Sequence, residues 1–256
     1  MKFIGTAVTD IGNVKKTNQD SVCVRIANSE KIGQIAMVVL CDGMGGLEKG
    51  ELASATVIRA FIAWFDNELP KLINKLSWKT FSAQWERLIK EQNFIISQFG
   101  KSRDVTLGTT VTALLAIGNK YLIAHVGDSR AYEIGSGFKQ LTEDQTFIAR
   151  EIKKGTMTPE QAAKDPRRNM LLQCVGASRE VVPQILFGDI KYNTVFMFCS
   201  DGFRHVLTDE EMYQAFNYTA ATNEIVMEQN SRVLIDTVKS RNERDNITVA
   251  LLKCSK

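Results

Sequence analysis

The chain has 256 residues, of which 44% are hydrophobic and 24% charged, a composition typical of a folded globular protein. It carries 32 basic and 29 acidic residues, which give a formal net charge of +3. This balance is too even to indicate nucleic acid or an anionic membrane as the main partner, although a local positive site for a phosphate-bearing molecule remains compatible with it.

The first strands are predicted from short apolar stretches. Residues 3–9 and 21–27 are typical of short strands on either side of a polar turn. Residues 35–41 are apolar without interruption and end in Asp-Gly, which predicts a strand buried on both faces.

Two amphipathic helices are expected next. Apolar side chains recur at helical spacing over residues 48–68, and Pro70 is expected to follow the end of this helix. A second helical pattern covers residues 81–99 and is expected to stop near Gly100. We interpret the tryptophans of this helical pair as core packing rather than as a ligand site.

The second half of the chain begins with strands. Residues 107–117, 120–126 and 130–134 are predicted to be strands, joined by tight turns at Gly118-Asn119 and Gly127-Asp128. Strands that follow one another through short turns imply largely antiparallel pairing.

The remaining elements complete the pattern. Residues 146–169 are polar and basic and predict a small helical insertion rather than a linker between domains. Strands are expected at 181–187 and 194–199, a helix at 224–240 and a closing strand at 246–253. Amphipathic helices need a sheet face to cover, so we expect a sheet pair or one large sheet with helices outside, folded as one domain over residues 1–256.

The cysteines and the N-terminus indicate a compartment. The five cysteines are widely spaced and include no Cys-x-x-Cys pair, which favours buried, reduced thiols over a zinc knuckle or a redox dithiol. Residues 1–9 lack the features of a signal peptide, and no apolar run approaches the ~20 residues of a membrane helix. We expect a cytoplasmic protein with no membrane association.

Candidate chemistry lies where acidic residues adjoin the ends of apolar strands. Asp42, Asp128, Asp201 and Asp245 all occupy such positions. A carboxylate at a strand rim is costly to bury alone, so several of them are expected to converge on a cation. Ligands that are all oxygen favour magnesium or manganese over zinc, and the two histidines cannot supply a histidine-rich zinc site.

The segment Asp42-Gly43-Met44-Gly45-Gly46 sharpens this prediction. Its glycines permit positive φ and close backbone approach, so that the Gly43 carbonyl could also reach a metal. The alternative is a plain glycine-rich turn. Asp201-Gly202 alone is also a common turn signal. The prediction depends on the repeated occurrence of an acidic residue beside an apolar strand.

Taken in chain order, the motifs resemble the metal-dependent protein phosphatases, the protein phosphatase 2C family, and in particular its bacterial-type members. The matching segments are Gly12-Asn-Val-Lys-Lys-Thr-Asn18-Gln-Asp20, Asp42-Gly-Met-Gly-Gly46, Gly108-Thr-Thr110, Val126-Gly-Asp128-Ser-Arg130-Ala-Tyr132, Leu141-Thr-Glu-Asp144, Ser200-Asp-Gly202 and Arg244-Asp-Asn-Ile-Thr248. They span almost the whole chain in the family's order and spacing.

The resemblance implies a fold and a metal centre. The fold is α+β, a four-layer α-β-β-α sandwich of two mostly antiparallel sheets flanked by helices, with a flap at residues 146–169. Two Mn2+ or Mg2+ ions are expected at one end of the sheets, with a third, weaker ion as an open alternative. By matching position, Asp42 would bridge two ions, and Asp201 and Asp245 would complete the first site. The Gly43 carbonyl would serve the second site, and Asp20 would act through metal-bound water. Asp128 with Asp201 would support the third ion.

The same resemblance implies a protein serine/threonine phosphatase. Two ions roughly 4 Å apart would generate a bridging hydroxide that attacks phosphorus in line, without a cysteine nucleophile. The implied partners are phosphorylated protein substrates and a cognate serine/threonine kinase, with no nucleic acid and no membrane, and a monomer is expected.

Two positions depart from the family pattern. Lys15 stands where the family usually has the arginine that clamps substrate phosphate; lysine keeps the charge but loses the bidentate fork. Met44 stands where some relatives have a histidine that serves as general acid, so the proton donor is unidentified. His125 and His205 match no catalytic position of the family and are interpreted as structural.

Three further interpretations remain open. The basic residues of the flap are either a solvated face or, as a weaker hypothesis, a surface that steers acidic phosphoprotein substrates. An inactive phosphatase fold that serves as a binding module is opposed by the intact Asp42, Asp201 and Asp245. A hydrolase of small phosphate esters or nucleic acid is the other alternative, and the lack of a basic, aromatic-rich stripe disfavours its nucleic-acid form.

Overall fold

Two five-stranded sheets stand face to face in the computed structural model, which describes residues 1–45 and 49–256. Every pairing within them is antiparallel. The first sheet has the order β1 (Lys2–Asp10), β12 (Ile247–Ser255), β11 (Thr194–Cys199), β8 (Arg130–Ile134) and β9 (Phe138–Gln140). The second has the order β10 (Gln184–Asp189), β7 (Lys120–Val126), β6 (Val111–Ile117), β3 (Gly33–Cys41) and β2 (Ser21–Ser29).

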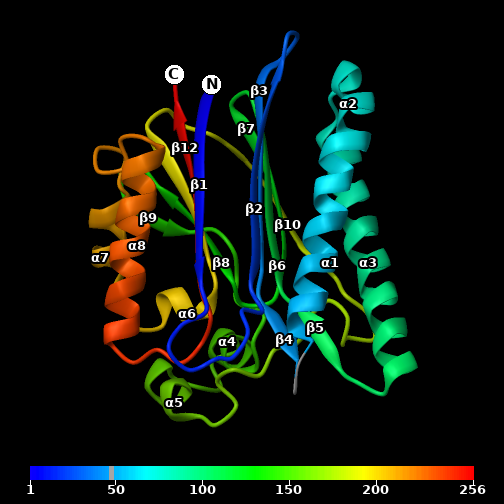
Figure 1. The fold of residues 1–256 in the computed structure, drawn as a ribbon, viewed down its shortest axis with the longest axis vertical. Helices are drawn as coiled ribbons and strands as arrows, with labels where there is room; N and C mark the ends of the chain where they lie inside the picture. The colour runs from blue at the N-terminus through cyan, green and yellow to red at the C-terminus, as the bar shows by residue number, and fades with distance from the viewer. Residues whose placement is uncertain (46–48) are drawn as a thin grey trace.

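Helices cover the outer face of each sheet, as Figure 1 shows. On the second sheet lie α1 (Gly50–Ala63), a π-helical turn (Trp64–Glu68), α2 (Leu69–Leu72), a short 3-10 turn (Ile73–Lys75) and α3 (Trp78–Arg103). On the first sheet lie α7 (Asp209–Phe216) and α8 (Glu224–Ser240). The expected four-layer α-β-β-α sandwich is therefore confirmed.

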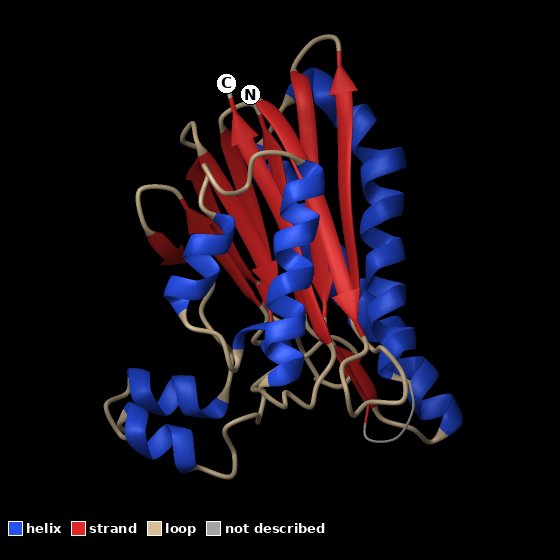
Figure 2. Cartoon of the chain, turned by 60° about the vertical axis from the view of Figure 1, so that its left-hand side comes forward, coloured by secondary structure: helices blue, strands red, loops and turns tan. Residues whose placement is uncertain are grey.

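The lower end of the sandwich carries the smaller elements. The short strands β4 (Gly43–Gly45) and β5 (Leu107–Thr109) pair with each other, and α6 (Asp201–Arg204) follows β11. The predicted helical insertion consists of α4 (Phe147–Lys153) and α5 (Pro159–Lys164), which stand as a separate pair beside this end in Figure 2. We refer to residues 146–169 as the flap.

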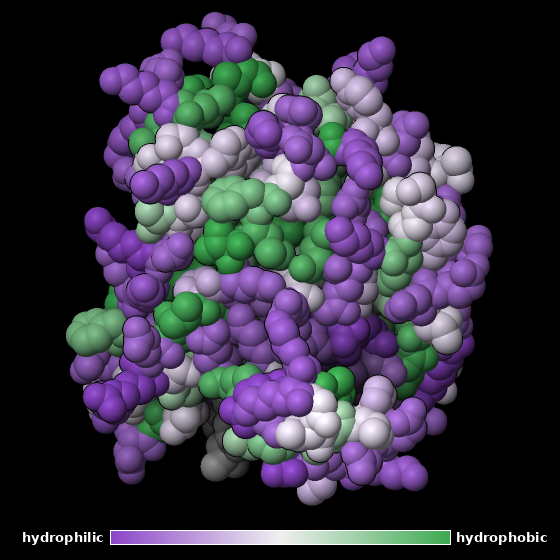
Figure 3. All heavy atoms as spheres, turned by 180° about the vertical axis from the view of Figure 1, so that it is seen from behind, coloured by the Kyte–Doolittle hydropathy of each residue, from purple (hydrophilic) through white to green (hydrophobic). Residues whose placement is uncertain are grey.

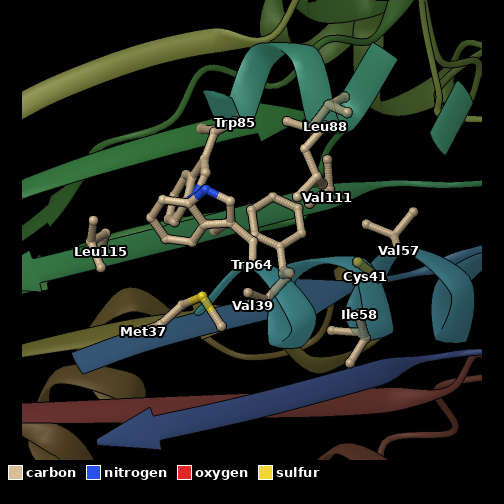
Figure 4. Packing of buried hydrophobic residues seen from close by; sticks show 14 of the residues in the cluster. Met37, Val39, Cys41, Val57, Ile58, Trp64, Trp85, Leu88, Val111 and Leu115 are labelled. Carbon is tan, nitrogen blue, oxygen red and sulfur yellow. The ribbon is translucent and has the colours of Figure 1, made fainter. Parts of the chain in front are cut away.

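Strand β3 shows why its sequence is apolar without interruption. Ala36, Val38 and Leu40 belong to the core between the two sheets. Met37 and Val39 point the other way and belong to the core under α1 and α3 (Figure 4). Because successive side chains of a strand alternate between faces, a central strand covered on both sides needs apolar residues at every position.

The tryptophans of the helical pair are core residues, as the sequence predicted. The Trp64 and Trp85 rings meet edge to face with centroids 5.5 Å apart, and Phe61 packs on Trp85 at 5.0 Å. Both tryptophans lie among aliphatic side chains of the second sheet in Figure 4. Such aromatic pairs add to the stabilisation that burial of their area already supplies.

The predicted end of the first helical segment at residue 68 matches the end of the π-helical turn, but Pro70 does not stop the helical course of the chain. The chain passes from α1 through the π-helical turn into α2, where Pro70 occupies the first turn. Proline is tolerated there because the N–H it lacks would have no helical partner. The predicted start at residue 48 lies outside the described residues, and α1 begins at Gly50.

Gly100 does not end the second helix either. Helix α3 continues to Arg103 and is terminated by Asp104, whose φ of 52° is left-handed. A Cβ on Gly100 would lie 2.6 Å from the Val105 carbonyl oxygen. Glycine is therefore required for close approach of the returning chain, and the sequence alone does not distinguish this need from helix termination.

Other boundaries match closely, with three departures. The predicted strand 107–117 is broken at Thr110 into β5 and β6, and β10 begins at Gln184 rather than at residue 181. The short elements β9, α6 and α7 were not predicted, because so few residues show no clear period. Strands β7, β8 and β11 and helix α8 have the predicted bounds.

The outer surface is mixed in character. Hydrophilic residues make up much of the face in Figure 3, and hydrophobic ones gather around its middle. Within residues 1–45 and 49–256, none of the helices has both the length and the apolar character needed to cross a membrane.

Candidate metal centre

The ends of β3, β7 and β11 and the starts of β2 and β12 lie at the lower end of the sandwich in Figure 1, and the aspartates singled out in the sequence adjoin these points. Asp42 follows β3, Asp128 follows β7, and Asp201 opens α6 directly after β11. Asp20 immediately precedes β2, and Asp245 lies just before β12. Antiparallel strands run alternately up and down, so strand ends and strand starts that are distant in sequence meet at one edge.

Thr110 holds the main chain of Asp42 from both sides. The Thr110 N–H donates to the Asp42 carbonyl at 2.8 Å, and the Asp42 N–H donates to Thr110 Oγ1 at 2.9 Å. The Thr110 hydroxyl also bonds the Ser129 hydroxyl at 2.8 Å. The break in the predicted strand 107–117 is thus the point at which the second sheet fixes Asp42.

Gly43 is required for close packing rather than for a left-handed turn. It pairs with Thr109 in the small β4–β5 sheet, and a Cβ at this position would clash with the carbonyl oxygens of Gly50 and Gln19. Gly43 does not have a positive φ. Gly46, the last glycine of the predicted motif, lies outside the described residues.

Asp201 is placed by the contact between α6 and β12. Ser200 exchanges hydrogen bonds with Thr248 of β12, donating through its N–H at 3.1 Å and accepting on Oγ at 3.0 Å. A Cβ on Gly202 would clash with the Asn246 carbonyl, so the Asp-Gly pair lets the helix start close to the strand. Within the described residues, Asp201 Oδ1 is buried and has no hydrogen-bond partner.

Asp245 is paired with Lys15. The Lys15 ammonium lies 2.7 Å from Asp245 Oδ1, and both side chains are more than one-third exposed. Burial opposes the charged form, but the hydrogen bond and the charge of Asp245, with the charges of Asp42 and Asp201, raise the pKa of Lys15. Lys15 is therefore within the electrostatic reach of three of the predicted ligands.

The loop that carries Lys15 is fixed by Asn246. The Asn246 side chain accepts from the Gln19 N–H at 2.9 Å and donates to the Ile11 and Thr17 carbonyls at 3.0 and 3.1 Å. Because Asn246 adjoins Asp245, the same residue that closes the loop also positions a predicted ligand. The sequence analysis quoted Asn246 within a motif but assigned it no role.

Burial and mutual repulsion act on the clustered carboxylates. Burial raises the pKa of Asp20 to about 7, against the hydrogen bond that its carboxylate accepts from Thr248 at 2.6 Å. Burial raises the pKa of Asp128 to about 7 as well, and the charge of Asp201 adds to the effect. For Asp42, burial and then the charges of Asp20 and Asp201 raise the pKa well above its usual range.

These observations decide whether the donor set suits divalent cations. Within residues 1–45 and 49–256, no three His, Cys, Asp or Glu side chains stand close enough together to hold one ion in the present arrangement. Two causes keep the carboxylates apart. Like charges repel in the absence of a cation, and the Asp245 carboxylate is paired with the Lys15 ammonium. The oxygen-only donors, the unpartnered Asp201 Oδ1 and the uncompensated charge nevertheless fit hard divalent ions, which would bring the carboxylates together.

A cavity of about 700 Å³ opens beside these aspartates. Its lining includes Lys15 from the loop between β1 and β2, Asp128 and Asp245 from beside the strands, and Thr146 and Arg168 from the flap. The flap therefore forms one wall of the space next to the predicted metal ligands. Of the basic flap residues singled out in the sequence, Arg168 lines the cavity.

Arg204 and His205 also line this cavity, and sequence reasoning gave neither a place in the site. His205 Nε2 lies 3.6 Å from Asp201 Oδ2, and Nδ1 lies 3.6 Å from Glu243 Oε2. The Asp201-to-His205 spacing of one helical turn could have signalled the first contact had α6 been predicted. His125 is structural, as interpreted: it is fully buried, with Nδ1 2.9 Å from the Thr112 hydroxyl.

Comparison with known proteins identifies the family. Residues 13–237 match the family model described as protein phosphatase 2C. The protein phosphatase PhpP of Streptococcus pneumoniae is 28% identical over 248 residues, which cover 96% of this chain and 95% of PhpP. The serine/threonine protein phosphatase PstP of Mycobacterium tuberculosis is 30% identical over 96% of this chain and 44% of its own length.

Solved structures agree. The Streptococcus agalactiae serine/threonine phosphatase superposes with a TM-score of 0.85 at 26% identity, covering 99% of this chain and 100% of that one. The catalytic domain of PstP in complex with two manganese ions has a TM-score of 0.77 at 27% identity, with 99% of each chain covered.

The fold, with aspartates gathered at one end of a β-sandwich, is that of a metal-dependent phosphatase. The chain belongs to the protein phosphatase 2C family. The family, fold class and enzyme class expected from the sequence are thereby confirmed.

Proposed function

We propose that this chain uses Mn2+ or Mg2+ to remove phosphate from phosphoserine and phosphothreonine in proteins. The observation that carries the proposal is the gathering of Asp42, Asp201 and Asp245, of which Asp245 lines a cavity of about 700 Å³ and Asp42 is under the repulsion of its acidic neighbours. Relatives of this family that are named serine/threonine phosphatases support the substrate class.

In this proposal the carboxylates of Asp42, Asp201 and Asp245 would hold the ions, and the Gly43 carbonyl would be a further ligand. Asp20 would contribute through water. Three features support these roles: Asp201 Oδ1 is unpartnered among the described residues, the Asp42 main chain is fixed by Thr110, and Gly43 tolerates no side chain. The PstP structure with manganese supports divalent ions of this kind.

When bound, such ions lower the pKa of a water molecule to near neutrality and neutralise charge on the phosphoryl oxygens. The chain supplies orientation. Lys15 lines the cavity with 39% of its side chain exposed and offers a positive charge to a phosphate oxygen. Arg168 of the flap also lines the cavity and offers a second charge for the flanking peptide.

The wider setting is also part of the proposal. We place the activity in the cytoplasm, opposed to a serine/threonine kinase, and we expect a monomer in which residues 1–256 act as one catalytic domain. The unpaired state of all five cysteines supports a reducing compartment. The even charge of the chain supports protein substrates over nucleic acid.

A substrate panel tests the proposal. Phosphoserine, phosphothreonine and phosphotyrosine peptides, p-nitrophenyl phosphate and DNA are assayed with and without Mn2+. We expect turnover that requires the ion and is fastest on the first two peptides. Turnover confined to p-nitrophenyl phosphate or DNA would reject the protein-substrate assignment, and no turnover of any substrate would favour a binding module.

A further inference from the structure

Asp128 and Asp201 form the part of the centre that faces the flap. Their carboxylates lie close enough for the charge of Asp201 to act on Asp128. These two residues are the pair on which a third ion was expected. The side chains around Asp128 and Asp201 determine whether a third ion could bind between them.

Arg204 brings a permanent positive charge to Asp128. Its Nη2 donates to the Asp128 main-chain carbonyl at 3.2 Å, and only 12% of the side chain is exposed. The guanidinium also lies 3.5 Å from Asp144 Oδ2. Its charge acts directly on the Asp128 carboxylate and opposes the effect of burial and of Asp201.

The charge of Arg204 also lowers the pKa of Asp144, which has an arginine of its own. Arg130 Nε and Nη2 donate to the two oxygens of Asp144 at 2.8 and 2.7 Å. This is the bidentate geometry in which a guanidinium and a carboxylate pair most strongly. Because Arg130 pairs with both oxygens of Asp144, the charge of Arg204 is shared between Asp144 and Asp128, and its Nε has no partner among the described residues.

His205 lies beside Asp201. Its imidazole lies between Asp201 Oδ2 and Glu243 Oε2, 3.6 Å from each. The two oxygens of Asp201 therefore have different surroundings: Oδ2 faces the imidazole, while Oδ1 is buried with no partner among the described residues. Oδ1 is free for the first ion site, whereas an ion shared with Asp128 would have to displace His205 from Oδ2.

We propose that Arg204 and His205 take the place of a third ion beside Asp128 and Asp201, so that the loaded centre holds two ions. This inference rests on the proposed function, since it assumes that Asp42, Asp201 and Asp245 hold the other ions. A guanidinium a few ångströms away repels a divalent cation, and the imidazole fills the space beside Asp201 that such a cation would need.

The test is a count of bound Mn2+ on the full chain, made by titration with free Mn2+ followed by electron paramagnetic resonance. We expect about two ions per chain in the wild type, and the same number in Asp128→Asn with dissociation constants changed by less than about threefold. Three ions in the wild type, with the third lost in Asp128→Asn, would overturn the proposal.

A gain-of-site variant tests the two side chains directly. Arg204→Ser combined with His205→Asp removes the guanidinium and supplies a carboxylate one turn from Asp201. We expect a third, weaker ion in this variant and none in Arg232→Ser, which removes an exposed arginine of α8. A folded double variant that still binds two ions would show that these side chains do not exclude the third.

The outcomes separate this inference from the function on which it rests. If the double variant fails to fold, the wild type and Asp128→Asn still decide the question. Three ions with phosphopeptide turnover would reject the inference alone. No bound ions and no turnover would reject both, and two ions without turnover would leave this inference standing and reject the function.

Discussion

The Lys15 ammonium lies 2.7 Å from Asp245 Oδ1, so the residue expected to hold substrate phosphate is paired with a proposed metal ligand. Lysine and ion therefore compete for the same carboxylate. Removing the lysine should favour the ion, because the ion then displaces no cation from Asp245 and meets less repulsion. We predict that Lys15→Ala tightens Mn2+ binding about two- to tenfold, measured by calorimetric titration.

Lys16 provides the matched control, since it adjoins Lys15 in the same loop. Lys16→Ala should leave the Mn2+ dissociation constant unchanged. Equal tightening in both variants would reduce the effect to general electrostatics and count against competition at Asp245.

Replacing Lys15 by arginine tests the same residue as a phosphate ligand. A guanidinium can hold two phosphoryl oxygens where an ammonium acts as a point charge. We predict that Lys15→Arg lowers KM for a phosphoserine peptide about two- to tenfold with little change in kcat. An unchanged KM, in a steady-state assay at saturating Mn2+, would remove Lys15 from the phosphate site.

Thr110 should matter for stability and for metal binding together. Thr110→Val keeps the shape but deprives the Asp42 N–H and the Ser129 hydroxyl of their partner. We predict a loss of about 1–3 kcal/mol in the free energy of unfolding, measured in urea, and weaker Mn2+ binding. Thr237→Val, at a half-buried position of α8 where the hydroxyl donates to the Val233 carbonyl of the same helix, should change neither. Unaltered Mn2+ affinity in a destabilised Thr110→Val protein would show that the hydrogen bonds between Thr110 and Asp42 do not contribute to metal binding.

Metal binding should stabilise the fold, because ions bind the native aspartate cluster and not the unfolded chain. At a free Mn2+ concentration about 100 times the dissociation constant, the expected gain is about 2.7 kcal/mol, seen as a rise in Tm. Asp201→Asn should abolish most of this rise, whereas Asp236→Asn, exposed on α8, should retain it. A full rise in Asp201→Asn would mean that the stabilising ions bind elsewhere.

His125 should make the stability depend on pH. Burial disfavours its charged form and lowers its pKa from 6.5 to about 4. The unfolded chain therefore binds more protons between these values, so stability is full above pH 6.5 and falls as the pH drops toward 4. The loss from this residue amounts to about 3 kcal/mol at most.

The contribution of His125 is isolated by difference. We predict that His125→Gln shows a shallower fall than the wild type in urea unfolding between pH 6.5 and 5. Parallel curves for the two proteins would contradict the buried, neutral imidazole. Other carboxylates titrate in both proteins alike and cancel in the comparison.

Much of the fold was readable because period and burial agree. The apolar run that became β3 predicted a strand covered on both faces, and the helical spacing that became α8 predicted its bounds. Pro70 and Gly100 were interpreted as helix ends, but proline and glycine each occur in two structural situations. A proline suits a first helical turn as well as a helix end, and a glycine permits close packing as well as termination.

The site divides in the same way. The positions of Asp42, Asp201 and Asp245 beside strands were readable from the sequence, and antiparallel topology brings such strand ends and strand starts to one edge. The surroundings of Asp128 were not readable, because Arg204 reaches Asp128 only through the tertiary fold and His205 follows a helix too short to predict. Contacts that depend on tertiary geometry leave no spacing signal in a single sequence.

The most direct test of the metal centre is the rate of phosphate release from a phosphoserine peptide by the wild type, Asp201→Asn and Asp236→Asn at saturating Mn2+. If Asp201 holds an ion that acts on the phosphoryl group, Asp201→Asn should lose activity about a hundredfold or more while Asp236→Asn keeps the wild-type rate. Wild-type turnover by a folded Asp201→Asn protein would contradict the proposed centre.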